Sequence, residues 1–172
     1  GPIYVSQSAS FTITDFDSFS TYAVAVSAGS VSRTDATISF TAPGTAGSVT
    51  LTLTKNAAPR AITLTILASG VSTPGITSPA NAATGVLGPS LTLTSSAFGW
   101  LGVSDTHLNS DWQLATDAGF ATSVQSTSTD AASKTSWTTT VAAGTTYYAR
   151  VRHRGAANGV SARGGDRPWS RR

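Results

Sequence analysis

The densest group of side chains that could do chemistry is Ser104-Asp105-Thr106-His107, with Asp111 a few residues further on. Two carboxylates and an imidazole could together ligate a divalent cation, but their spacing matches neither an EF-hand loop nor a zinc motif. Aspartate also caps turns in ordinary polar loops, and this simpler interpretation is favoured. We therefore expect no metal site and no cofactor.

Few other side chains in the sequence could take part in catalysis. The chain has no Glu, no Cys and two His. His153 lies on the apolar face of a predicted strand, which favours a hydrogen-bonded histidine at the edge of the core over a ligand. The glycines of Arg163-Gly164-Gly165-Asp166 do not lead from a strand into a helix, as a phosphate-binding loop requires. Because an enzyme needs an acid, base, nucleophile or metal in convergent geometry, we expect no enzymatic activity.

A basic strand is the strongest candidate for binding. From Thr146 to Arg154, alternation places Tyr147, Ala149, Val151 and His153 on an apolar face, and it places Tyr148, Arg150, Arg152 and Arg154 on the opposite, hydrated face. Arg163 and Arg167 follow a turn and could return beside them. Such a face could meet an acidic protein, lipopolysaccharide phosphate or nucleic acid, and a merely solvated face is the simpler alternative. Nucleic acid is disfavoured, because only Tyr148 is interleaved with the arginines.

The charge distribution sets this strand apart. The net charge of +3 combines an excess of three negative charges in residues 1–149 with an excess of six positive charges in residues 150–172. The first part of the chain is therefore close to neutral, whereas its last 23 residues are basic.

Three tryptophans receive predicted roles. Trp112 and Trp137 lie in predicted strands and are expected in the core. Trp100 lies between Gly99 and Gly102 in a predicted long loop. A loop aromatic at the end of a sandwich can stack on a sugar or a partner protein, so Trp100 is the second candidate contact residue.

The elements that must position these residues are predicted to be strands. The chain is 40% hydrophobic and 11% charged, and apolar residues alternate with Thr and Ser in short segments, which favours antiparallel sandwiches. No segment approaches about 18 unbroken apolar residues, so we expect no membrane span. Gly and Pro cluster before residue 76, which divides the chain into a sandwich at 1–70, a linker at 71–75 and a second sandwich at 76–172.

The second unit resembles a known module. Its Thr77-Ser78-Pro79 entry, Ser110-Asp111-Trp112, Thr135-Ser136-Trp137 and Thr145-Thr146-Tyr147-Tyr148 resemble the fibronectin type III-like modules of tailed-bacteriophage virion proteins and some bacterial surface proteins. The resemblance covers roughly residues 75–162. The first unit more loosely resembles the bacterial and phage immunoglobulin-like repeats that often precede this module.

The resemblance implies two tandem antiparallel β-sandwiches, immunoglobulin-like and then fibronectin type III-like. It implies that Tyr147 bonds back to the corner before its strand, and it supplies no catalytic residues. It also implies a structural or display component of a virion surface, such as a head decoration, neck or tail-fibre element. The partners would then be other capsid or tail proteins, in homo-oligomeric or arrayed form, with weak adhesion to bacterial surface glycan.

Two other hypotheses about the function remain open. The first is a bacterial cell-surface or secreted adhesin module that binds glycan or anionic polymer, and the second is an accessory module of a larger enzyme. One departure from the module concerns its end, because residues 162–172 lack the expected alternation and predict a poor or short last strand.

The predicted linker generates a test. We expect the two units to unfold as nearly independent transitions, because a short linker couples sandwiches weakly. All four tryptophans follow residue 75, so fluorescence reports the second unit while calorimetry reports both. A single calorimetric transition that coincides with the fluorescence change would contradict independence.

Overall fold

The computed structural model describes residues 1–84 and 89–170, without the side chains of residues 166 and 167. The described residues form strands and turns, and none of them belongs to a helix that could cross a membrane. Two compact units result, one from Gly1–Ser69 with Leu101–Val103 and the other from Gly70–Trp100 with Ser104–Arg172. Gly70–Val71, at the start of the predicted linker, form the short strand β8.

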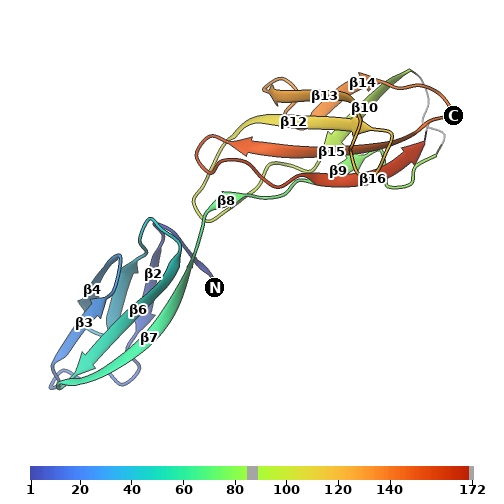
Figure 1. The fold of residues 1–172 in the computed structure, drawn as a ribbon. Coiled ribbons are helices and arrows are strands. Elements are labelled where there is room, and N and C mark those ends of the chain that lie inside the picture. The colour runs from blue at the N-terminus through green and yellow to red at the C-terminus, as the bar shows by residue number, and fades with distance from the viewer. Residues whose placement is uncertain (85–88, 171–172) are drawn as a thin grey trace. The chain divides into compact units, whose positions relative to one another are not determined.

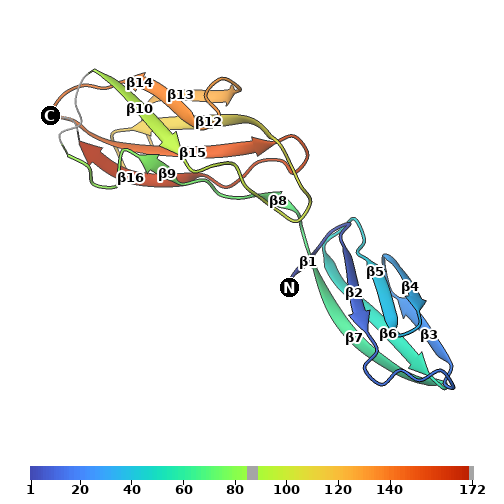
Figure 2. The same ribbon diagram turned by 180° about the vertical axis from the view of Figure 1, so that it is seen from behind.

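The first unit contains seven strands in two sheets (Figures 1 and 2). Their bounds are β1 Ile3–Tyr4, β2 Ser8–Thr12, β3 Tyr22–Val26, β4 Ser30–Thr34, β5 Thr37–Thr41, β6 Gly47–Lys55 and β7 Ala58–Leu67. One sheet has the order β2-β5-β4 and the other β1-β7-β6-β3. This division of consecutive strands between two sheets is the immunoglobulin arrangement.

The core of the first unit is built from the apolar positions of the alternating segments. Phe40, Val49 and Ile66 form one buried cluster, and Ile38 and Leu51 belong to the next. Between β6 and β7 the chain turns in two residues, Asn56 and Ala57, whose φ angles are 48° and 64°. Two successive positive φ values match the twist of a tight hairpin, so the chain enters β7 already at Ala58 and Pro59 lies inside this strand.

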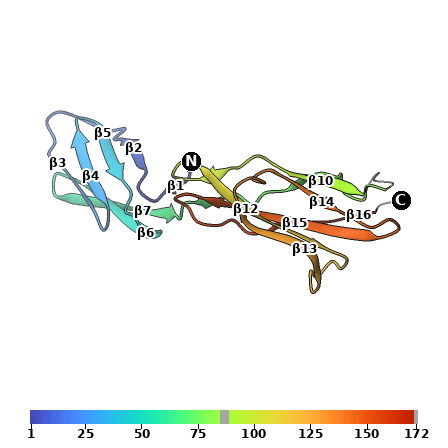
Figure 3. The same cartoon turned by 90° about the horizontal axis from the view of Figure 1, so that it is seen from above.

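The remaining strands belong to the second unit, except that β11 joins Trp100 of the second unit to Leu101 of the first. These are β8 Gly70–Val71, β9 Ile76–Ser78, β10 Ser90–Ser95, β11 Trp100–Leu101, β12 His107–Ala115, β13 Ser123–Asp130, β14 Ser136–Thr140, β15 Thr146–Gly155 and β16 Gly164–Ser170. One layer has the order β14-β10-β9 (Figure 1) and the other β13-β12-β15-β16 (Figure 3). The predicted fold class, immunoglobulin-like and then fibronectin type III-like, is confirmed.

The two layers of the second unit enclose a single core. Trp112, Leu114 and Val151 are fully buried, and the rings of Trp112 and Trp137 lie 6.3 Å apart. The Tyr147 hydroxyl accepts a hydrogen bond of 2.9 Å from the Ala142 N–H, which fastens the turn before β15. The outer face of the β10–β14 pair is uncharged, with the exposed hydroxyls of Thr92 and Thr138 2.9 Å apart.

The prediction of a poor or short last strand in the second unit is wrong. Residues 164–170 form a full strand, β16, antiparallel to β15. Trp169 is 2% exposed and stacks on Tyr147 with 5.2 Å between ring centres. Pro168 is tolerated because β16 is an edge strand and needs no ladder on its outer side. A strand with only one buried aromatic anchor lacks the alternation on which the prediction relied.

The buried indole of Trp112 generates a test. Trp112→Ala should cost about 3–5 kcal/mol of unfolding free energy, because the residue is fully buried and its Nε1–H donates to the Ser133 carbonyl. Trp100→Ala is the matched control, since Trp100 is 45% exposed, and it should cost less than about 1 kcal/mol. Urea unfolding measures both values, and equal losses would contradict the placement of Trp112.

Candidate functional site

Pairing between β12 and β15 builds a charged face on the second unit. The register places Arg152 opposite Asp111 and Arg150 opposite Gln113. Residues of β15 alternate between buried and half-buried, so the predicted division of this strand into two faces is confirmed. The arginines lie on the face away from the core, with Tyr148 half-buried among them.

The centre of this face is the carboxylate of Asp111, whose residue is 1% exposed. Arg152 Nε lies 2.5 Å and Arg154 Nη2 2.7 Å from its Oδ2, while the Thr129 N–H donates to Oδ1 at 2.7 Å. Burial alone would raise the pKa of the Asp111 carboxyl. The hydrogen bonds from Arg154, Thr129 and Arg152 outweigh burial and hold this pKa well below its ordinary range. Asp111 therefore stays ionised and neutralises one positive charge.

Arg150 is held differently. Its Nε donates to the Gln113 Oε1 at 2.7 Å, and its guanidinium carbon lies 4.0 Å from the centre of the Phe120 ring. A neutral amide and an aromatic ring orient the guanidinium without cancelling its charge. Arg150 therefore contributes a fixed positive charge to the face.

Arg163 completes the group. Burial lowers the pKa of its guanidinium, and the positive charges of Arg152 and Arg150 lower it further. Its Nη1 is buried and has no hydrogen-bond partner among the described residues. The arginine face, defined as Arg150, Arg152, Arg154 and Arg163, thus holds four guanidinium groups and one buried carboxylate, which pairs with Arg152 and Arg154.

The other predicted contact residues lie elsewhere or outside the described atoms. Arg167 is opposite Ala149 in β16, but its side chain is outside the described part of the structure. Trp100 belongs to the short strand β11, paired with β8, rather than to a long loop. Its exposed ring lies 6.2 Å from that of Phe98 and is not part of the arginine face.

The possible cation ligands Asp105, His107 and Asp111 have separate structural roles. Asp105 accepts hydrogen bonds of 2.7–2.9 Å from the backbone N–H groups of Thr106, Ala157 and Asn158. Burial would raise the pKa of Asp105, but these bonds outweigh it and lower the pKa. No group of three potential metal-ligating side chains is found among residues 1–84 and 89–170.

A pair of histidines is the feature that sequence reasoning missed. The rings of His107 and His153 lie 4.4 Å apart, and Phe98 stacks on His107 at 4.7 Å. His153 is fully buried, with its Nε2 3.1 Å from the Ser95 hydroxyl. Alternation along β15 places His153 in the core, but nothing in the sequence indicates that the ring of His107 would contact it.

Both imidazoles resist protonation. Burial is the larger cause and the charge of the neighbouring His107 the smaller one, and together they lower the pKa of His153 to about 4. Burial, followed by the charge of Lys134, lowers the pKa of His107. The pair is therefore neutral at pH 7 and acts as part of the core at one end of the sandwich.

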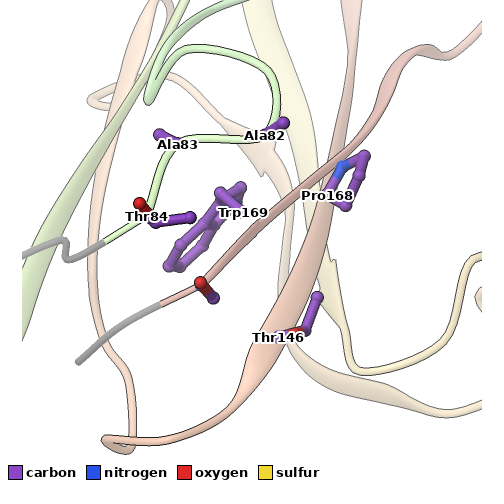
Figure 4. A pocket seen from close by; sticks show the side chains of 7 residues that line it. Ala82, Ala83, Thr84, Thr146, Pro168 and Trp169 are labelled. Atoms are coloured by element: carbon purple, nitrogen blue, oxygen red, sulfur yellow. The ribbon is translucent and has the colours of Figure 1, made fainter.

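A hollow of about 210 Å³ opens beside Trp169 and is lined by Ala82, Ala83, Thr84, Thr146, Pro168 and Ser170 (Figure 4). Trp169 lies at its centre, yet only 2% of the residue is exposed. A ligand could not stack on an indole so well covered, so we assign the hollow no binding role.

Comparison with known proteins finds no matching protein family and no matching curated protein. Among solved structures, the chain is similar to the Clostridium thermocellum CbhA fibronectin(III)-like modules, with a TM-score of 0.39, 11% identity, and 99% of this chain and 88% of that chain covered. It is also similar to the adhesin InvE of Yersinia pseudotuberculosis (TM-score 0.33, 16% identity, 94% of this chain and 55% of that chain).

A third similar structure contains three N-terminal domains of the Highly Immunogenic Outer Capsid protein of bacteriophage RB49, with a TM-score of 0.34, 11% identity, and 99% of this chain and 66% of that chain covered. At such identities and scores, the fold assignment rests on the strand pairing of the chain itself.

The histidine pair generates a pH test. The pKa of His153 is about 4 in the folded unit and 6.5 in a model peptide, so between these values only the unfolded chain binds the proton. Stability of the second unit is therefore full above pH 6.5 and falls as the pH drops toward 4, by roughly 3 kcal/mol from this group. The two histidines are the only side chains in the sequence with ordinary pKa values between 5 and 7.

Urea unfolding followed by tryptophan fluorescence at pH 7.5, 6.5, 5.5 and 4.5 measures this loss. His153→Phe is the control, since it keeps an aromatic ring but cannot take up a proton, and its pH dependence should be much shallower. Equal stability of the unsubstituted chain at pH 7.5 and 4.5 would show that His153 protonates as readily when folded as when unfolded.

Proposed function

We propose that the chain is a non-enzymatic surface module that attaches through its arginine face to an anionic partner. The observation that carries the proposal is the charge balance of this face, where one carboxylate meets four guanidinium groups. Arginine presents several donors in a rigid fork, which suits carboxylate, sulfate and phosphate groups. An anion beside Arg163 would relieve the repulsion between its guanidinium and those of Arg150 and Arg152.

For the location, we propose the surface of a bacteriophage virion, as a head decoration, neck or tail-fibre element. The support is the sequence resemblance of residues 75–162 to modules of virion proteins. The partner would then be an acidic capsid or tail protein, in a homo-oligomeric or arrayed setting. A bacterial cell-surface or extracellular adhesin that binds anionic polymer is favoured by the same arginine face, and it remains the second candidate.

The proposal is tested with an immobilised sulfated polysaccharide, heparin, and with uncharged dextran as the blank. Binding to heparin should weaken about tenfold between 0.05 and 0.3 M NaCl, because salt screens exposed charges beyond about 10 Å. Arg150→Gln with Arg163→Gln should weaken it about tenfold at low salt, since neither arginine has a carboxylate partner among the described residues. Arg152 and Arg154 are avoided, because they neutralise the buried Asp111 and their loss would destabilise the unit.

Arg33→Gln with Arg60→Gln is the matched control, because it removes the same two positive charges from the first unit. It should leave heparin binding within about twofold of the unsubstituted chain. If neither salt nor the double substitution weakens heparin binding, the arginine face is not the contact surface. Immunogold electron microscopy with antibodies to the chain then separates the two locations, since label on virions supports the first candidate and label on bacterial envelopes the second.

A further inference from the structure

In the first unit, β2 and β7 belong to different sheets (Figure 2). The hydrophobic core has an opening between these two strands. A hollow of about 200 Å³ is lined there by Phe11, Ile13, Ile38, Leu51, Leu53 and Ile62. Sandwich cores are normally closed at such a seam by a strand that pairs with one of the two edges. We call this opening the edge groove.

The exposure of the β7 side chains shows where no strand covers the core of the first unit. Ile66, Leu64, Ile62 and Arg60 follow each other on the face toward the other sheet. Ile66 is 1% exposed, Leu64 is half-buried and Ile62 is 51% exposed. The short strand β1 covers only the first of these, because its two residues pair with Ile66 and Leu67.

The backbone of β7 is also open along this edge. The Leu67 carbonyl accepts from the Val5 N–H, so the polar groups of Leu67 point to the edge away from β6. Backbone direction alternates along a strand, so Ala61, Thr63 and Thr65 present their N–H and C=O groups to the same edge. Among the described residues, no strand pairs with this edge between Ala58 and Thr65. Unpaired groups of this kind accept an added strand.

One positively charged side chain, that of Arg60, lines the edge groove. Lys55 is matched by Asp15 and Asp17, at 3.2 and 3.0 Å. Arg60 lines the edge groove, and no ion pair or hydrogen bond of its side chain is found among the described residues. A carboxylate on an incoming strand would complement this cation.

We propose that the edge groove binds an extended segment of a partner protein, which adds as a strand to β7. The segment is about eight residues long, with apolar side chains at alternate positions that cover Ile62 and Leu64 and an acidic side chain opposite Arg60. Main-chain hydrogen bonds to Ala61, Thr63 and Thr65 supply affinity, and the apolar hollow and Arg60 supply selectivity. This inference goes beyond the proposed function, because the edge groove and the arginine face share no residue and lie in different units.

The test uses a fluorescein-labelled peptide of about eight residues with blocked termini, alternating valine and threonine, with one aspartate placed to meet Arg60. Fluorescence anisotropy measures its affinity for the full chain. Ile62→Lys puts a charge into the edge groove and should weaken binding at least about tenfold. Thr50→Lys is the matched control, because Thr50 is exposed on the opposite face of the same sheet in the neighbouring strand β6, and it should change affinity by less than about twofold.

A charge exchange tests the selectivity. Arg60→Asp should weaken binding of the aspartate peptide about tenfold and prefer a peptide with lysine at that position. Urea unfolding checks that each variant is folded, which is expected because Ile62 and Arg60 are exposed.

Three results would overturn the proposal. The first is no binding of either peptide to the unsubstituted chain, and the second is equal binding by the Ile62→Lys variant. The third comes from sedimentation equilibrium without peptide: self-association that Ile62→Lys abolishes would assign the edge groove to a second copy of this chain. Loss of heparin binding in the arginine-face variants leaves these outcomes unaffected, so the two proposals fail separately.

Discussion

The buried carboxylate of Asp111 is the interaction on which the charged sheet of the second unit depends. It lies between two β15 arginines and a β13 backbone amide, and so it ties three strands together through one ionised group. Removing a charge partner from such a site costs far more than the pair contributes, because the remaining charges lose their compensation. The arginine face is therefore a structural element as well as a surface, and only Arg150 and Arg163 can be changed without touching its centre.

Alternation along single strands could be read from the sequence, whereas contacts across strands could not. Tyr147, Val151 and Trp112 could be assigned to the core because a period of two places them there. Asp111 and Arg152 are 41 residues apart, and which acid meets which arginine is decided by the β12–β15 register. The same register brings the two histidines together. A sequence pattern fixes faces, but it does not fix the register between distant strands.

The end of the chain shows a second limit of sequence reasoning. Trp169 closes the core, yet the residues before it include Gly, Asp and Pro, which individually disfavour strands. Pairing with β15 and stacking on Tyr147 outweigh these local preferences. An edge strand needs only one buried anchor, so its sequence can be nearly free of pattern. The open seam of the first unit is similarly invisible in the sequence, since Ile62 alternates like any core residue.

The uncharged hydroxyl face formed by β10 and β14 gives the second unit an electrical asymmetry. The guanidinium groups lie on one layer of the sandwich, while the opposite layer presents Thr92 and Thr138. Two layers stacked about 10 Å apart with charge on one of them form an electric dipole across the thickness of the unit. Near a negatively charged surface, the resulting torque would turn this unit before contact is made. Such an approach would preselect one orientation, leaving the hydroxyl layer facing outward toward solvent.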